Sequence, residues 1–123
     1  LSVNTFESAV LINNESFFDF KPLPNYAQFS STNDIIIQDF NNDNINDIVL
    51  VGNMYHAEIE TTRNDSGNGL LLQGIGNGDF KEISVSKSGF FAPGDSKKII
   101  SLKSKNDNLL IIANNDDRLQ IFK

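Results

Sequence analysis

The sequence predicts an all-β protein, and three observations lead to that fold class. Short apolar runs recur along the chain and are bounded by Asn, Asp, Gly, Ser and Pro, a pattern typical of strands joined by turns. No segment of useful length carries a helical period. Ile is abundant and there are 10 Phe, residue types that favour a pleated, half-buried surface.

Nine strands are expected. The first strand is an apolar run. The second strand is an aromatic run after the turn at residues 13–16, and Pro22 and Pro24 end this second strand. The long stretch 53–67 is polar without a clean period and predicts a loop. In chain order the expected strands span residues 8–13, 17–21, 34–38, 47–52, 69–74, 80–84, 98–102, 108–113 and 119–122.

Turn signals support these boundaries. Asn77-Gly78 lies between two of the runs and is a strong hairpin signal. Gly74-Ile75-Gly76-Asn77-Gly78 also loosely resembles a phosphate-binding loop, but the Lys and the following helix of that motif are missing. A hairpin explains these residues fully.

The strands recur as an internal repeat with a period near 61 residues. The matching positions are Leu11 with Leu72, Phe18 with Phe80, the run 35–37 with 99–101, and Asn53 with Asn114. Four short strands per period predict antiparallel four-stranded blades of a partial β-propeller. Residues 1–24 would end one blade, 34–84 would form a complete blade, and 97–123 would form an incomplete one. About two blades cannot close a ring, so we expect a fragment of a larger propeller.

The loop Asp39–Asp47 predicts a metal site. Oxygen-bearing side chains occupy its first, third, fifth and ninth positions, at Asp39, Asn41, Asp43 and Asp47. The backbone carbonyl of Ile45 would add a ligand at the seventh. Hard cations such as Ca²⁺ take six to eight oxygen ligands.

Two other interpretations of this loop are an EF-hand and an empty polar turn. An EF-hand is excluded, because Leu50 stands where the bidentate Glu is needed and the flanks are not helical. An empty polar turn remains open, because Asn and Asp close turns without metal and the chain holds 17 Asn. Asn44 stands at the position of the usual Gly and tolerates a positive φ.

The residues 39–50 resemble the calcium-loop signature of FG-GAP or VCBS repeats, the integrin α-subunit kind of β-propeller. The resemblance implies that Asp39, Asn41, Asp43, Ile45 and Asp47 bind Ca²⁺ between the first two strands of a blade. Asn44 departs from the family's Gly, and Asn41 lowers the charge of the site. The matching loop in the next repeat, 103–108, carries lysines, so no metal is expected there.

Composition and charge exclude several classes of function. The net charge of −6 with a pI near 4.5 argues against nucleic acid as a partner. No apolar run approaches the length of a membrane span, and the absence of Cys excludes thiol chemistry.

Catalytic residues are not evident. His56 is the single histidine and is expected to be a solvated loop residue, and Glu58 and Glu60 are expected to be surface charges. We therefore expect a non-enzymatic, calcium-stabilised scaffold or binding module that engages protein or glycan. It would belong to an exported protein, extracellular, at the cell surface or periplasmic, of bacterial origin, and self-association through exposed blade faces is possible. The alternative is the propeller part of a larger lyase or hydrolase whose active site lies outside this chain.

Overall fold

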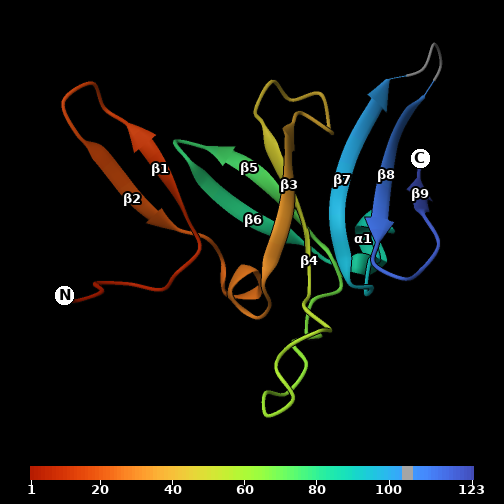
Figure 1. Cartoon of the computed structure of the whole chain (residues 1–123). Helices are drawn as coiled ribbons and strands as arrows, with labels where there is room; N and C mark the ends of the chain where they lie inside the picture. Colours follow the sequence, from red (N-terminus) through yellow and green to blue (C-terminus); the bar gives the residue numbers. More distant parts are fainter. Residues whose placement is uncertain (104–106) are drawn as a thin grey trace.

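A computed structural model describes residues 1–103 and 107–123, and it confirms the all-β class with antiparallel pairing throughout. Three sheets lie side by side (Figure 1). The first holds two strands, the second four and the third three. In chain order the strands are β1 (Ala9–Asn13), β2 (Phe18–Pro22), β3 (Thr32–Gln38), β4 (Asp47–Gly52), β5 (Leu70–Gly76), β6 (Asp79–Ile83), β7 (Ser96–Lys103), β8 (Asn108–Asn114) and β9 (Gln120–Phe122).

The nine expected strands are all present in the described residues, with small shifts at their ends. β3 and β7 both begin two residues earlier than expected, because each continues past a bulge at its start. Two one-turn helices follow β2 and β6, namely η1 (Asn25–Gln28) and α1 (Val85–Ser88). No helix in the described ranges is long and apolar enough to cross a membrane.

The expected hairpin at Asn77-Gly78 is confirmed. Asn77 has φ 54° and Gly78 has φ 74°, the left-handed pair that a tight two-residue turn requires. This turn lies near the first sheet, where the Lys21 ammonium is 3.1 Å from the Asp79 carboxylate. The residues Gly74 to Gly78 therefore form a strand end and a turn rather than a phosphate loop.

The second and third sheets share the same local geometry. The bulge in β3 lies between Thr32 and Asp34, and the bulge in β7 lies between Ser96 and Lys98. Ile36 stands opposite Val49, and Ile100 stands opposite Ile111, so corresponding positions are 64 residues apart in β3 and β7 but 62 apart in β4 and β8.

This register corrects one sequence match. The backbone N–H of Asn53 donates to the Ser31 carbonyl at 3.0 Å, and that of Asn115 donates to the Asp95 carbonyl at 2.9 Å. Asn53 therefore corresponds to Asn115, and the predicted match with Asn114 is wrong by one residue. The connection between corresponding positions of these strands is therefore two residues shorter in the third sheet than in the second. A one-residue slip of this kind is hidden in sequence by runs of identical residues, here Asn114 and Asn115.

Two apolar clusters hold the sheets together. One lies between the second and third sheets, and its most buried members are Val49, Val51, Ala92, Ile99 and Ile112. The other lies between the first and second sheets and consists of Leu23, Ala27, Ile48, Leu50 and Leu72. Each fully buried Val, Leu or Ile side chain stabilises the fold by about 1.5–3 kcal/mol.

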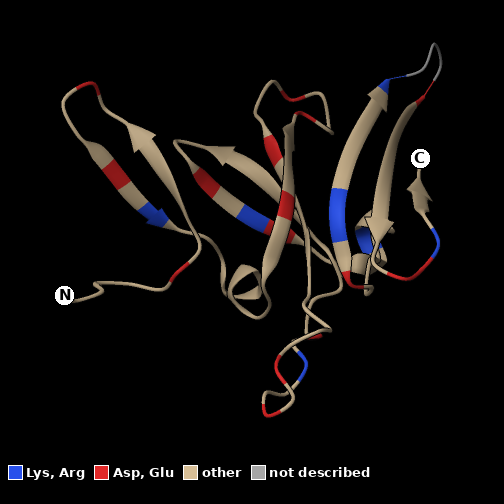
Figure 2. Cartoon of the chain, in the orientation of Figure 1, with Lys and Arg blue, Asp and Glu red and all other residues tan. Residues whose placement is uncertain are grey.

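Polar contacts also join β3 to β7. The Asp34 carboxylate accepts a hydrogen bond from the Ile99 N–H at 2.8 Å and lies 3.0 Å from the Lys98 ammonium. Figure 2 shows this acidic band on β3 beside the basic band on β7. Partial burial alone would raise the pKa of Asp34, but the Ile99 N–H and Lys98 outweigh it and lower the pKa below its ordinary value.

Candidate functional site

The loop between β3 and β4 holds all five residues expected to bind metal, and it lies at one end of the second sheet (Figure 1). Asn42 has φ 62° and Asn44 has φ 67°. Asn44 thus adopts the left-handed conformation expected for the sixth position, which Asn tolerates better than most residues.

Asp39 organises the first half of this loop. Its Oδ1 accepts hydrogen bonds from the backbone N–H groups of Asn42 at 2.7 Å and Asp43 at 3.3 Å. Its Oδ2 accepts another from Asn44 at 2.9 Å. The carboxylate therefore gathers three loop amides around one point, as an Asx-type turn does.

Asn41 and Asp43 are joined to each other. The Asn41 side chain accepts a hydrogen bond from the Asp43 N–H at 2.9 Å and donates to Asp43 Oδ2 at 2.8 Å. The Ile45 N–H donates to Asp43 Oδ1 at 2.8 Å. The Ile45 amide first and the Asn41 amide second lower the pKa of the exposed Asp43 carboxyl, because both stabilise its charged form.

Asp47 closes the loop from the buried side. It is only 2% exposed, and its two oxygens accept hydrogen bonds from the Phe40 N–H at 3.1 Å and the Gly74 N–H at 2.9 Å. A Cβ at Gly74 would lie 2.3 Å from the Asn46 carbonyl oxygen. Glycine is thus required where β5 approaches the loop, and Asp47 fixes the loop to that strand.

The donor set fits a hard cation by its chemistry. Each carboxylate oxygen has two lone pairs, so the loop amides leave acceptor capacity on Asp39, Asp43 and Asp47. The ion pairs of the described residues include none with these three aspartates, and no described residue donates a backbone hydrogen bond to the Ile45 carbonyl. A buried carboxylate without a positive partner is costly, and a bound cation would remove that cost.

The present arrangement is that of a hydrogen-bonded turn. Among the described residues, no three His, Cys, Asp or Glu side chains gather closely enough to hold a metal ion. The polar-turn interpretation thus remains open beside the metal site. The corresponding loop of the third sheet, 103–108, includes residues 104–106, which lie outside the described ranges, so its predicted lack of a metal site stays a prediction.

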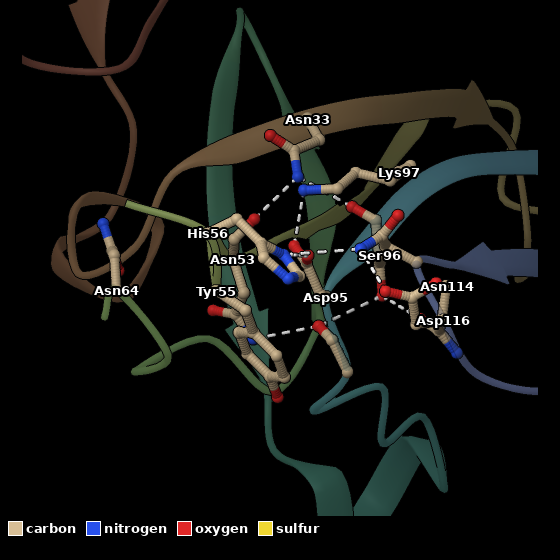
Figure 3. Close-up of polar contacts among 12 residues, drawn as sticks. Asn33, Asn53, Tyr55, His56, Asn64, Asp95, Ser96, Lys97, Asn114 and Asp116 are labelled. Carbon is tan, nitrogen blue, oxygen red and sulfur yellow. Dashed lines mark hydrogen bonds and ion pairs between the residues drawn. The ribbon is translucent and has the colours of Figure 1, made fainter. Parts of the chain in front are cut away.

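A second polar cluster was not expected from the sequence (Figure 3). Its centre is Asp95, just before β7, whose side chain is 1% exposed. Asp95 Oδ1 contacts the Lys97 ammonium, whereas Oδ2 has no hydrogen-bond partner. His56 Nδ1 lies 3.8 Å from Oδ2. No local signal marks Asp95, because the long loop that covers it is distant in sequence.

Asn53 fastens that long loop to the segment that leads into β7. It is 1% exposed and has φ 78°. Its side-chain amide donates to the carbonyls of Gly67 at 2.7 Å, Pro93 at 3.0 Å and Gly94 at 3.1 Å. Its Oδ1 accepts the Gly67 N–H at 2.9 Å. A buried side chain with all its groups bonded in this way has a structural role.

His56 lies at the edge of this cluster. Its side chain is 75% exposed, as expected for a loop histidine, and its Nδ1 is 3.4 Å from the Asn115 side-chain amide. Neither Asn115 nor Asp95 carries a hydroxyl or thiol that an imidazole could deprotonate. Glu58 and Glu60 are exposed in the same loop.

Comparisons of the chain with family models, with curated proteins and with solved structures gave no match in any of the three.

Proposed function

We propose that this chain is a calcium-stabilised, non-enzymatic β-propeller module of an exported or cell-surface protein, and that it binds a protein or glycan through its loops. The observation that carries the proposal is the Asp39–Asp47 loop. Three aspartates lie within nine positions of it, and none forms an ion pair with a described basic residue. Ca²⁺ would supply the missing positive charge.

The residues that would hold the ion are Asp39, Asn41, Asp43 and Asp47 through side-chain oxygens, and Ile45 through its carbonyl. The bound cation would neutralise the repulsion among the three carboxylates and would stiffen the connection between β3 and β4. The chain itself contributes the turn, through the left-handed Asn42 and Asn44. Asp47 anchors that turn on β5.

The propeller organisation is supported by the matching geometry of the second and third sheets. They share a bulge and a strand register, and each sheet packs its apolar face on the next one. Successive units that bury their faces only against neighbours are typical of repeat architectures. Loops on such a rigid frame are the usual place for ligand binding.

The export proposal rests on calcium availability. A site with a dissociation constant of about 10⁻⁴ M is filled at the roughly millimolar Ca²⁺ found outside cells. Occupancy of that order would stabilise the folded state by about 1.4 kcal/mol through mass action. The loop would then be most stable in a calcium-rich compartment.

Thermal unfolding in excess EDTA and in 1–5 mM CaCl₂ tests this proposal. We expect the melting temperature to rise by roughly 5–10 °C with calcium, from the stabilisation above and the size of the chain. Asp43→Ala should abolish the rise, because it removes a ligand carboxylate at an exposed position.

Asp19→Ala is the matched control, since it removes an exposed carboxylate from β2, outside the loop. It should leave the calcium response intact. An equal melting temperature with and without calcium in the unmodified chain would refute the site. Loss of the response in both variants would show that calcium acts through general charge instead.

A further inference from the structure

Among the residues that the structure describes, nothing covers one face of the third sheet. Ile100 is 49%, Leu102 50% and Ile121 63% exposed. Ile111 stands opposite both Ile100 and Ile121 in the register, so it lies on the same face. We call Ile100 and Leu102 of β7 and Ile111 of β8 the trailing face.

The second sheet also has an uncovered region, on its opposite side. Ile35 is 47% and Ile37 is 57% exposed on β3. The segment that follows β2 covers the neighbouring strands of this side, where Leu23 and Ala27 belong to one cluster with Leu50, but it leaves β3 bare. We call Ile35 and Ile37 the leading face.

The two uncovered faces correspond to the two that already pack together inside the chain. Ile100 corresponds to Ile36, which packs against the cluster between the second and third sheets. Ile99, 64 positions after Ile35, belongs to that cluster and is 3% exposed. Inside the chain, Ile36 of the second sheet thus packs against the cluster that includes Ile99 of the third sheet. Ile100 and Ile35 are their respective counterparts, and both are exposed.

We propose that a second copy of this chain docks head to tail, its leading face on the trailing face of the first. The new contact would repeat the one between the second and third sheets. The occupant is a further copy because the complementary surface is one this chain itself presents. The contact continues an interface that the structure already contains.

Charge supports the same arrangement. Inside the chain, Asp34 of β3 lies 3.0 Å from Lys98 of β7. These two residues occupy corresponding positions beside the bulges. At the head-to-tail contact, Lys98 of the first copy would therefore meet Asp34 of the second. The new contact would therefore pair a positive with a negative charge, as the internal contact does, and would not bring like charges together.

The β1–β2 hairpin of the second copy fits into this contact. Leu11 is 58%, Phe18 65% and Phe20 41% exposed, and the register places them on one face of the hairpin. Under the same correspondence, this face would turn toward the second sheet of the first copy. The docking would therefore cover the exposed hairpin as well as β3.

The proposed docking requires a free strand edge on the second copy. β1 pairs only with β2 in the described chain, so its other edge is free. By the same correspondence, β1 of the second copy would lie where β9 of the first copy lies. Docking would therefore replace β9, of 3 residues, by β1, of 5 residues, as the neighbour of β8. The longer strand offers more ladder hydrogen bonds to β8. An unpaired edge is also a natural site for pairing with another chain.

The contact joins different faces of the two copies, so it is heterologous and propagates to longer assemblies. Two single substitutions separate the faces. Ile35→Glu disables the leading face only, and Ile100→Glu disables the trailing face only. Each would weaken association by roughly 100-fold or more, because a carboxylate replaces a buried apolar group.

Sedimentation velocity across about 1–500 µM tests the proposal. The unmodified chain should rise from 13.7 kDa toward multiples of that mass, and each variant alone should remain monomeric. Mixed in equal amounts, the two variants should form a 1:1 dimer and nothing larger. Ile100→Glu retains the leading face, and Ile35→Glu retains the trailing face.

Ile59→Glu is the matched control, because Ile59 is fully exposed in the long loop and lies outside both faces. It should associate like the unmodified chain. Three results would overturn the proposal: a monomeric unmodified chain at 500 µM, self-association of either variant alone, or two variants that remain monomers when mixed. A monomer that keeps its exposed faces would point to another protein as the occupant. Repeating the runs in EDTA separates this proposal from the calcium site, since neither face includes the Asp39–Asp47 loop.

Discussion

The second and third sheets begin with the same register and the same bulge, yet their surroundings differ. The second sheet has four strands and neighbours on both sides. The third has three strands and, within residues 1–103 and 107–123, a neighbour on one side only. The comparison teaches that the strand pattern is a local property, whereas burial depends on what packs beside each sheet. Corresponding residues therefore differ in their contribution to stability.

The largest difference is expected within β8. Ile112 is fully buried between the sheets, whereas its neighbour Ile111 belongs to the trailing face. Ile112→Ala should lower the free energy of unfolding by about 2–5 kcal/mol, because it leaves a cavity. Ile111→Ala should lower it by less in the monomer, because Ile111 is only half-buried. Urea denaturation of both variants at low protein concentration measures the two values, and equal losses would contradict the assignment of the faces.

The next largest difference concerns the two corresponding asparagines. Asn53 is buried and bonded to three carbonyls, whereas Asn115 is exposed. Asn53→Ala should cost about 1–3 kcal/mol, because it leaves buried backbone groups without partners. Asn115→Ala should fall within about 0.5 kcal/mol of the unmodified chain. Thermal unfolding compares them, and a larger loss in Asn115→Ala would refute the role given to the long loop.

A smaller effect is expected from pH at the contact between β3 and β7. The pKa of Asp34 is lowered from 3.8 in the folded state. Its contribution to stability is therefore complete well above pH 3.8 and is lost as the pH falls below that value through the folded pKa. Asp34→Asn should remove part of this acid sensitivity.

Melting temperatures between pH 2 and 6 measure the effect, with Asp19→Asn as the matched control. The unmodified chain and the control should both lose stability toward low pH. The profile of Asp34→Asn should be flatter below about pH 4. A profile parallel to the control over the whole range would contradict the ion pair with Lys98.

Much of the fold was predictable because it rests on local signals. The apolar runs predicted the nine strands, and Asn77-Gly78 predicted a hairpin whose left-handed φ values are observed. The bulges that begin β3 and β7 were missed, because nothing in their sequence marks the extra residue. The match of Asn53 to Asn114 failed because two adjacent asparagines offer two equal alignments.

The site was predictable only in part. The sequence identified the loop Asp39–Asp47 and the left-handed Asn44, because the spacing of oxygen-bearing residues is local. It did not reveal that Asp47 is buried against β5. Nor did it reveal the buried Asp95, which is brought near His56 by a contact between residues far apart in the chain. Such long-range burial depends on how the sheets pack.

The central claim is that one loop, in the second sheet, binds calcium and that its counterpart at 103–108 does not. Isothermal titration calorimetry with CaCl₂ tests this claim directly. The account predicts one ion per chain, with a dissociation constant of about 10⁻⁴ M, and complete loss of binding in Asp43→Ala. An absence of binding, or two ions per chain, would contradict it.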